Sequence, residues 1–372
     1  MMKKLGFGLM RLPLTNPDDQ TSIDMEQFKQ MADRFMERGF TYFDTAYPYH
    51  GGKSEEALRE AVVKRYPRDA FTVTSKMPVW AIKEASDMER IFNEQLQRCG
   101  VDYFDYYWLH ALNRERVAAI DGVDGWGFLT RMRDEGKIRH IGFSFHDDSA
   151  LLAEILENHP EMEYVQLQIN YLDWESPAIE SRTCYGLCVK HGRPVIVMEP
   201  VKGGSLARVP EQVERLFKDY NPEASPASWA IRYCASLPGV FTVLSGMSNM
   251  EQLEDNIGYM QDFQPLNDEE QAIIGRATDV IRDSIAIHCT ACHYCSEGCP
   301  QQIAIPEYFS LYNTMQQFPE QKGNCTLYYN LVAKSHGKAS ECLECGQCEA
   351  QCPQHIDIIE NLKLIAQAFE SE

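Results

Sequence analysis

Residues 40–76 read FTYFDTAYPYHGGKSEEALREAVVKRYPRDAFTVTSK, and this stretch decides the fold. It begins and ends with runs of aromatic and β-branched residues, Phe40–Asp44 and Phe71–Lys76, which predict two strands. Between them, Glu55–Lys64 has apolar residues at the spacing of an amphipathic helix. A strand, a helix and a second strand in this order are typical of a βα unit, in which the helix crosses over to start a parallel strand. We therefore predict a parallel sheet covered by helices.

The chain repeats this alternation up to residue 245. Further strands are predicted at Leu5–Leu9, Tyr103–His110, His140–Ser144, Tyr164–Ile169, Val195–Glu199 and Phe241–Ser245. Helical patterns separate them, at Met25–Arg38, Ser86–Cys99, Ser149–Glu157, Pro177–His191 and Ala227–Ser236. Eight strands with crossover helices over about 250 residues favour an α/β fold of the (β/α)8 TIM barrel type. No GxGxxG motif follows the first strand, which argues against a doubly wound dinucleotide-binding sheet.

The C-terminal segment contains the spacing C-x2-C-x2-C-x3-C-P twice. Its eight cysteines are Cys289, Cys292, Cys295, Cys299, Cys342, Cys345, Cys348 and Cys352. Three thiolates at three-residue intervals can surround one face of an iron–sulfur cubane, while the fourth, before proline, reaches the other cluster. We therefore predict two [4Fe–4S] clusters with crossed ligation, in which Cys352 joins the first three cysteines and Cys299 joins the second three. Disulfides and zinc remain the alternatives, because both also use CxxC pairs.

A change from the alternating to a helical pattern predicts a domain boundary near residue 285. We expect residues 1–285 to form the barrel, and residues 286–372 to form a small, mostly α-helical ferredoxin-like domain. Helical patterns at Pro306–Gln317 and Ile358–Phe369 favour this, and the stretch between the cysteine runs is too long for a compact β-type ferredoxin loop.

The composition excludes two classes of partner. Lys and Arg number 35 against 55 Asp and Glu, a formal net charge of −20, and no basic stripe is present that would neutralise a nucleic-acid backbone. No apolar run approaches the length of a membrane span, and the first ten residues are too short for a signal peptide's apolar core. Because a reducing compartment favours cluster ligands over disulfides, we expect a cytoplasmic protein without nucleic-acid or membrane partners.

Titratable residues stand where three adjacent predicted strands end. Asp44 closes one strand and Tyr49 follows it, Lys76 closes the next, and His110 closes the third. Catalytic groups of a TIM barrel lie at the C-terminal ends of its strands. Taken singly, each residue has an ordinary explanation as a helix cap, a packing aromatic, a solvated strand end or a core histidine. Together they predict a proton-transfer site.

These four residues suit the reduction of a carbonyl by hydride. The forming alkoxide needs a proton, and a phenol with an ordinary pKa of about 10 is a weak donor at neutral pH. A nearby ammonium lowers that pKa, and a carboxylate holds the ammonium. We therefore expect Tyr49 to be the general acid and Lys76 to lower its pKa. Asp44 is expected to bind Lys76, and His110 to orient the substrate or relay the proton.

At this point the sequence resembles the aldo-keto reductase superfamily, in the subgroup with a C-terminal two-cluster ferredoxin-like domain. The residues that carry the resemblance are Asp44 with Tyr49 five positions later, Lys76, Leu109-His110 and the helix start Ser54-Glu55-Glu56. The resemblance implies a barrel that binds NAD or NADP over its top. It also implies hydride transfer to or from an aldehyde, ketone or sugar carbonyl. Trp80 and Trp174 are expected to line the mouth of the site.

The resemblance further implies contacts with the dinucleotide. Ser144 and Gln168 correspond to residues that hold the nicotinamide carboxamide, and Met198 takes the place of a stacking aromatic. The contacts expected on the phosphate and adenosine side are Pro200, Lys202, Gly246, Ser248, Gln252 and Asn256. Gln252 stands where NADP-preferring members often have arginine, so the choice between NAD and NADP stays open.

Two other functions remain open on the sequence alone. In one, the clusters exchange electrons with a redox partner protein, although nicotinamide moves two electrons, a cluster moves one, and no flavin motif is visible to convert between them. In the other, the barrel is a binding scaffold and the clusters only fold the C-terminal domain, since metal binding often drives folding. The complete set of four titratable residues favours the enzyme.

Overall fold

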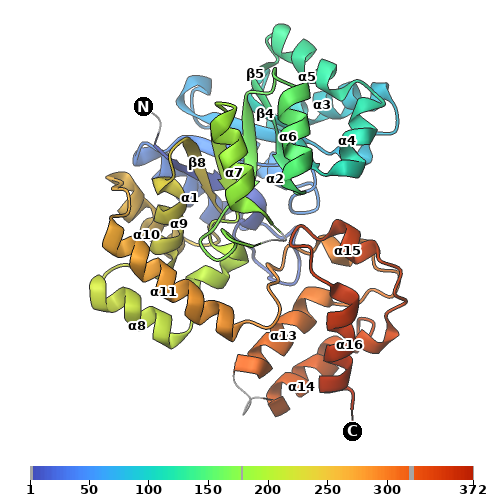
Figure 1. Ribbon diagram of the computed structural model, residues 1–372. Helices are drawn as coiled ribbons and strands as arrows, with labels where there is room; N and C mark the ends of the chain where they lie inside the picture. Colours follow the sequence, from blue (N-terminus) through green and yellow to red (C-terminus); the bar gives the residue numbers. More distant parts are fainter. Residues whose placement is uncertain (1–2, 177–178, 318–321, 372) are drawn as a thin grey trace. The chain divides into compact units, whose positions relative to one another are not determined.

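The computed structural model describes residues 3–176, 179–317 and 322–371. Within these residues, eight parallel strands form a closed barrel (Figure 1). The strands are β1 (Leu5–Gly8), β2 (Tyr42–Asp44), β3 (Thr72–Met77), β4 (Phe104–Leu112), β5 (Ile138–Phe145), β6 (Tyr164–Gln168), β7 (Val195–Met198) and β8 (Val240–Ser245). Each lies within two residues of a predicted strand, and the predicted (β/α)8 barrel is confirmed.

Pairing of the first and last strands closes the sheet. β1 is parallel to β2, with Gly8 opposite Asp44, and also to β8, with Phe7 opposite Ser245. Because every neighbouring pair is parallel, all eight C-terminal strand ends meet at one rim of the barrel. This rim is where the predicted site residues gather.

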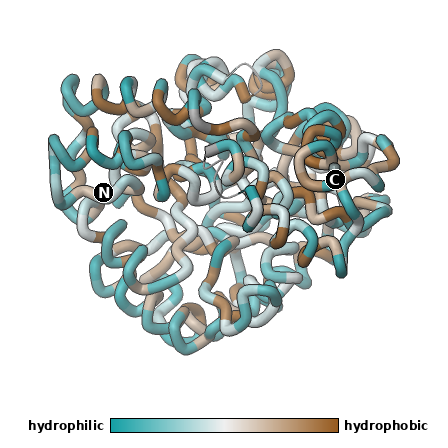
Figure 2. The backbone as a smooth tube through the Cα atoms, turned by 90° about the horizontal axis from the view of Figure 1, so that it is seen from below, coloured by the Kyte–Doolittle hydropathy of each residue, from teal (hydrophilic) through white to brown (hydrophobic). Residues whose placement is uncertain are grey.

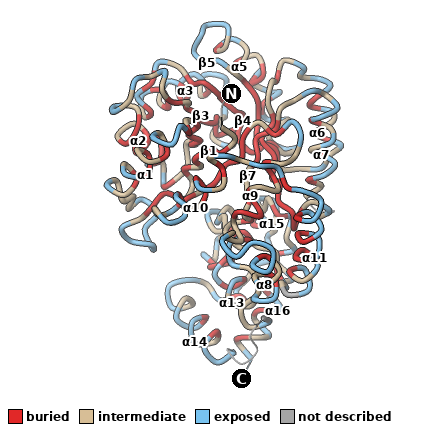
Figure 3. Tube along the Cα trace, turned by 90° about the vertical axis from the view of Figure 1, so that its left-hand side faces the viewer, coloured by how far each residue is buried: buried red, intermediate tan, exposed pale blue. Residues whose placement is uncertain are grey.

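The barrel interior is packed solid with side chains. Figure 3 shows the strands as buried and the outer loops as exposed. One core cluster inside the barrel combines an aromatic group with aliphatic residues, and its buried members are Tyr42, Tyr106, Trp108, Ile196 and Leu244. Trp108 is therefore a core residue rather than part of the site.

Helices surround the barrel, and Figure 2 shows hydrophobic and hydrophilic residues alternating along them. In the barrel unit they are α1 (Met25–Glu37), α2 (Ser54–Leu58), α3 (Ala85–Cys99), α4 (Arg114–Asp121), α5 (Gly125–Asp134), α6 (Ser149–Asn158), α7 (Ser181–Lys190), α9 (Pro226–Ser236) and α10 (Met250–Gln261). A helical pattern was also predicted from Pro177, but residues 177 and 178 lie outside the described part of the chain. Four glycines just beyond α1, α3, α5 and α7 have the left-handed backbone of a C-cap, namely Gly39, Gly100, Gly136 and Gly192.

A second compact unit comprises Ser176–Ile179, Val201–Pro226 and Asp268–Glu372. Its helices are α8 (Glu211–Tyr220), α11 (Asp268–Ser284), α12 (Tyr294–Glu297), α13 (Ile305–Gln317), α14 (Lys322–Val332), α15 (Gln347–Gln351) and α16 (Ile358–Phe369). The predicted helical character of the C-terminal domain is confirmed. The boundary near residue 285 stays a prediction, because this unit also takes in segments that precede it.

The helices of the second unit pack around aromatic side chains. The Tyr308 and Tyr329 rings lie 4.4 Å apart, and Phe369 stacks on Tyr329 at 5.2 Å. Tyr329 also donates a hydrogen bond of 2.5 Å to Glu370. Among the helices of the described residues, none is long and apolar enough to cross a bilayer.

Gly142 in β5 tests how tightly the barrel is packed. A Cβ atom there would lie 2.2 Å from the Tyr164 carbonyl oxygen and 2.8 Å from the Trp108 ring. Because the carbonyl belongs to a neighbouring strand and cannot move alone, we predict that Gly142→Ala lowers the free energy of unfolding by about 2 kcal/mol or more. Denaturant unfolding measures this. Gly258→Ala in α10, where no heavy atom lies within 4 Å, is the control and should not destabilise; equal effects of the two variants would contradict the packing argument.

Candidate active site and cluster sites

A buried ion pair forms the floor of the candidate active site. Lys76 Nζ donates hydrogen bonds to Asp44 Oδ1 at 2.5 Å and to the Thr45 carbonyl at 2.8 Å. Both charged side chains are almost fully buried. Burial raises the pKa of Asp44 and lowers the pKa of Lys76, while their mutual attraction opposes both shifts. The ammonium is thus fixed in place by two acceptors from the second strand and its following loop.

The phenol and the imidazole lie beside this pair. Lys76 Nζ is 5.1 Å from the centre of the Tyr49 ring, and the Tyr49 and His110 rings meet edge to face at 6.0 Å. The structure therefore brings all four residues of the predicted proton-transfer site together. Burial, followed by the charges of Asp44 and Glu199, raises the pKa of Tyr49.

We expected Lys76 to lower the Tyr49 pKa, and the direction found here is the opposite. The Lys76 ammonium is turned to Asp44 and Thr45, and it faces the Tyr49 ring rather than bonding its oxygen. Desolvation and nearby carboxylates then dominate at the phenol. Tyr49 consequently holds its proton across the neutral range.

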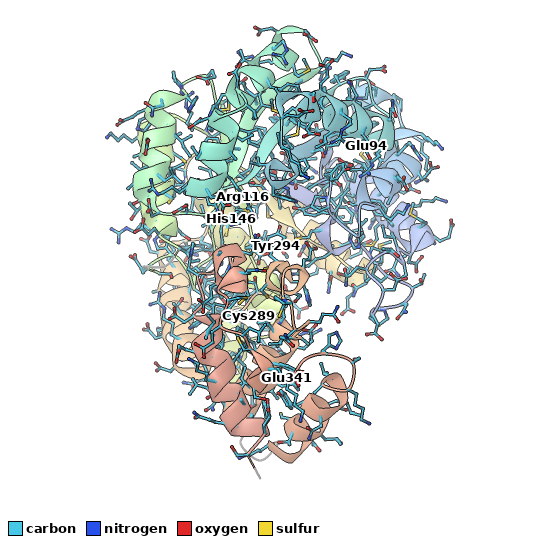
Figure 4. All side chains as sticks on the ribbon, turned by 90° about the vertical axis from the view of Figure 1, so that its right-hand side faces the viewer. Glu94, Arg116, His146, Cys289, Tyr294 and Glu341 are labelled. Atoms are coloured by element: carbon cyan, nitrogen blue, oxygen red, sulfur yellow. The ribbon has the colours of Figure 1, made fainter. Side chains whose placement is uncertain are left out.

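The imidazole of His110 is uncharged at neutral pH. Burial and then the charges of Lys76, His146 and Arg116 hold its pKa well below the ordinary value; His146 and Arg116 are labelled in Figure 4. Its Nδ1 atom has no hydrogen-bond partner among the described residues. The Trp80 ring packs on the imidazole at 5.0 Å and is 47% exposed, as expected for a residue at the mouth of the site.

The backbone is strained next to three site residues. His50 follows Tyr49, Ala111 follows His110 and Glu199 follows Met198, and all three have positive φ, at 54°, 56° and 57°. Such conformations cost roughly 1–3 kcal/mol each and cluster at functional sites. Neighbours hold two of them in place: Ser144 Oγ accepts the Ala111 N–H at 2.6 Å, and the His50 ring bonds the backbone of Leu12 and Gln20.

A buried polar network supports the strand that carries Lys76, and the sequence analysis missed it. Glu55 Oε1 accepts hydrogen bonds from Ser75 Oγ and Gln95 Nε2, both at 2.7 Å. Gln95 Nε2 also donates to the Lys76 carbonyl at 3.1 Å, and Tyr107 donates to Gln95 Oε1. Burial raises the pKa of Glu55 to about 7. The only sequence signal was the Ser54-Glu55-Glu56 helix start.

The predicted nicotinamide contacts lie at the ends of consecutive strands β5, β6 and β7. Ser144 and Gln168 are buried, and Met198 is half-buried with Pro200 just beyond it. Gln168 Nε2 donates to Asp173 Oδ2 at 3.2 Å, but its Oε1 has no hydrogen-bond partner among the described residues. An orphaned, buried amide oxygen fits the N–H donors of a carboxamide.

The predicted adenosine-end residues lie after β8. Gly246 and Ser248 are in the loop, and the Ser248 N–H donates to Gln252 Oε1 at 2.7 Å. Asn256 is buried and internally bonded, since it donates to Ser245 Oγ at 2.7 Å and accepts from Tyr259 at 2.5 Å. Asn256 therefore stabilises the end of β8 and the start of the following loop through internal hydrogen bonds.

Arg11 and Lys202 are two cations with contacts that the sequence does not reveal, although Lys202 is a predicted contact on the phosphate side of the dinucleotide. Arg11 side-chain carbons lie 3.2–3.3 Å from the point where a Gly246 Cβ would be, so this arginine lies beside the predicted adenosine-end loop. Lys202 belongs to the second compact unit, where its Nζ donates to Gln354 Oε1 at 2.9 Å. Neither position has a local sequence motif that reveals these contacts.

Four cysteines converge on one cavity in the second unit. Cys299 lines it together with Cys342, Cys345 and Cys348, which is the set predicted for the second cluster. Apolar residues complete the wall, including Leu343 and Ile359. Cys345 is exposed and Leu343 is 62% exposed, so this site lies close to solvent.

The other four cysteines are also neighbours. The charge of Cys352 contributes to raising the pKa of both Cys289 and Cys295, with burial as the main cause, and Cys292 acts on Cys295 in the same way. This proximity fits the predicted crossed ligation. All thirteen cysteines are free thiols, which does not support the disulfide alternative. Among the described residues, no three potential ligand side chains converge on a point suited to a single metal ion.

Known proteins share this fold. The sequence profile of the aldo/keto reductase family matches residues 4–279, and that of the 4Fe-4S dicluster domain matches residues 288–356. An aldo-keto reductase of Mycolicibacterium vanbaalenii is 27% identical over 244 residues, which cover 64% of this chain and 80% of that protein. The 9,11-endoperoxide prostaglandin H2 reductase of Trypanosoma cruzi is 25% identical over 244 residues, covering 64% and 78%.

A solved structure shows the same fold. It is an aldo-keto reductase from Klebsiella pneumoniae in complex with NADPH, with a TM-score of 0.57, 22% identity, and coverage of 74% of this chain and 95% of that one. The closed barrel with titratable groups at its strand ends is the arrangement of a TIM-barrel enzyme, and the family match makes it an oxidoreductase. The chain belongs to the aldo/keto reductase family and carries a 4Fe-4S dicluster domain in addition.

Glu55 gives the fold a predicted pH dependence. Its pKa is about 7 in the folded protein against an ordinary 4.5, so between these values the folded state holds a proton that the unfolded chain has lost. The contribution of Glu55 to the free energy of unfolding is therefore fully present below pH 4.5. It falls by up to about 3 kcal/mol as the pH rises to 7. Glu55→Gln keeps the acceptor oxygen and should remove this loss, as measured by denaturant unfolding from pH 5 to 8.

The matched control is Glu56→Gln, the next residue of the same helix, whose side chain is 41% exposed and paired with Lys53. It should keep the wild-type dependence of the unfolding free energy on pH. An unchanged pH dependence in Glu55→Gln would show that the carboxyl group is not protonated in the folded protein.

Proposed function

We propose that this protein reduces small aldehydes, ketones or sugar carbonyls with a nicotinamide dinucleotide at the rim of its barrel. The observation that carries the proposal is the convergence of the Tyr49 phenol and the His110 imidazole on the buried Lys76–Asp44 pair. When bound, the dinucleotide supplies the hydride. Support for its binding comes from the unpartnered Gln168 Oε1 and from the NADPH complex of the structural neighbour.

The side chains divide the remaining tasks. Tyr49, which stays protonated because its pKa is raised, donates its phenolic proton to the oxygen that becomes the alcohol. The Lys76 ammonium stabilises the phenolate as the proton leaves, and Asp44 with the Thr45 carbonyl keeps the ammonium in position. The neutral imidazole of His110 orients the substrate oxygen without competing for the proton.

The surroundings of His110 suggest the kind of substrate. Trp80 offers a half-exposed aromatic surface beside the imidazole, and the Arg116 guanidinium lies 5.1 Å from the Trp80 ring. A carbonyl compound with an apolar portion next to its reacting carbon suits this surface. The test compares NADH with NADPH, because Gln252 lacks the positive charge that would select a 2′-phosphate. Arg11, which lies beside Gly246, carries such a charge.

Removal of the proton donor tests the proposal. We predict that Tyr49→Phe lowers kcat/KM for carbonyl reduction by about 100-fold or more, because the alkoxide then lacks its acid, while NADH and NADPH bind as before. Steady-state assays with a panel of aldehydes and ketones, combined with fluorescence titration of the dinucleotide, measure both quantities.

Tyr47→Phe is the matched control, because it removes a phenol from the same loop. The Tyr47 hydroxyl donates to Glu94 at 3.2 Å and its ring lies under the Arg98 guanidinium, so it has other partners. This variant should retain turnover. Wild-type rates in Tyr49→Phe would contradict the assignment of the acid, and no turnover by the wild type with any carbonyl would favour a binding scaffold.

A further inference from the structure

Helix α14 exposes three large apolar side chains. Leu327, Tyr328 and Leu331 are 58%, 59% and 46% exposed. Among the described residues, no other helix has more than one exposed large apolar side chain. Single exposed leucines are ordinary in soluble proteins, whereas apolar groups that gather on one surface mark an interaction site.

The inner face of α14 fixes which side of the helix points outward. Cys325 and Tyr329, four residues apart, are buried in the core of the second unit. The Tyr329 ring packs on Tyr308 at 4.4 Å, and its hydroxyl accepts a hydrogen bond from the Ala339 N–H at 2.8 Å. The three apolar residues lie on the other side of the helix, so they cannot turn inward without breaking these contacts.

The segment that carries these residues is basic, although the chain as a whole is acidic. Residues 322–338 contain three lysines and no Asp or Glu, while the net charge of the chain is −20. Lys322 and Lys334 are exposed at the two ends of α14. Lys334 follows Leu331 in a turn that continues the helix, since its N–H bonds the Leu331 carbonyl. We call the three apolar residues together with these two lysines the α14 surface.

The α14 surface belongs to the unit that holds both cysteine sets. Ala339, which bonds Tyr329, lies three residues before Cys342 of the second set, a span of at most about 11 Å. In the loop of that set, Leu343 and Cys345 are exposed. A protein bound to α14 is therefore close to the cysteine set that opens to solvent.

We propose that the α14 surface docks an acidic one-electron carrier protein, which exchanges electrons with the cluster of the second cysteine set. The apolar residues exclude water from the centre of the contact, and the lysines attract a carrier whose own apolar patch is surrounded by acidic residues. Each encounter transfers one electron, so the carrier is oxidised as the cluster is reduced. This role goes beyond carbonyl reduction and does not depend on it.

Two other occupants fit the α14 surface less well. A second copy of the chain, packed by twofold symmetry, would bring lysines against lysines. Helices that lie on an anionic bilayer are rich in Lys and Arg, and this surface has only two lysines.

Binding of purified carriers tests the proposal. Full-length protein, prepared anaerobically with both clusters, is titrated by calorimetry with a small acidic ferredoxin and with an acidic flavodoxin. We expect at least one carrier to bind, and to bind more weakly as salt is added. Leu331→Gln and Lys334→Glu should each raise Kd about tenfold or more. Leu364→Gln on α16 and Lys218→Glu on α8 are the matched controls and should keep the wild-type Kd, since both residues are exposed in the same unit but lie outside the α14 surface.

A second measurement separates docking from electron exchange. The chemically reduced carrier is mixed with the protein, and its reoxidation is followed by absorbance. We expect reoxidation by the wild type, and a loss of it without a change of Kd in Cys345→Ser, which alters only the second cluster.

Several results would overturn the proposal. They are the absence of binding by both carriers, wild-type Kd values in both α14 variants, equal weakening in the controls, and binding without reoxidation of the carrier. Binding to phosphatidylglycerol vesicles, or self-association of the chain, would also overturn it if the α14 variants abolished that binding, because a bilayer or a second copy would then be the occupant. None of these outcomes depends on carbonyl turnover.

Discussion

The parallel pairing of β1 with β8 is the constraint on which the rest of the barrel depends. It closes the sheet, and closure turns the C-terminal ends of eight strands into one rim. Asp44, Lys76 and His110 are 32 and 34 positions apart along the chain, yet they become neighbours because β2, β3 and β4 are adjacent and parallel. The residues expected to hold the nicotinamide follow on β5, β6 and β7. The order of the strands around the barrel therefore sets the order in which the predicted catalytic residues and the predicted nicotinamide contacts follow one another along the rim.

Burial sets the protonation of this site. A buried ion pair is weak evidence for stability, since removing both charges from water costs about as much as their attraction returns. The role of the ion pair here is to fix the position of a charge, because Asp44 and the Thr45 carbonyl hold the Lys76 ammonium next to the Tyr49 ring. The same burial keeps Tyr49 protonated and His110 neutral. In the proposed reaction, one proton donor and one neutral hydrogen-bonding ring face the substrate, and the Lys76 ammonium stabilises the phenolate.

The sequence was sufficient for the features that repeat or that sit at strand ends. The alternation of strand and helix predicted the barrel, and the spacing of the cysteines predicted which four share a cavity. It was insufficient where a contact joins distant segments through side chains. Glu55 meets Ser75 and Gln95 only because a helix and a strand pack together. Lys202, which the Lys-Gly-Gly loop predicts as a phosphate contact, also donates to Gln354, 152 positions away, and no local pattern indicates this hydrogen bond.

The central claim is that hydride chemistry belongs to the barrel and does not pass through the clusters. Nicotinamide gives two electrons together with hydrogen, whereas a cluster takes one electron and any hydrogen would then come from water. The most direct test uses NADH and NADPH carrying deuterium at the transferable position of the nicotinamide, with an aldehyde substrate in ordinary water. We predict that the alcohol carries the deuterium on its carbinol carbon, as measured by mass spectrometry or proton resonance. An alcohol without deuterium, formed from either labelled dinucleotide, would contradict the account.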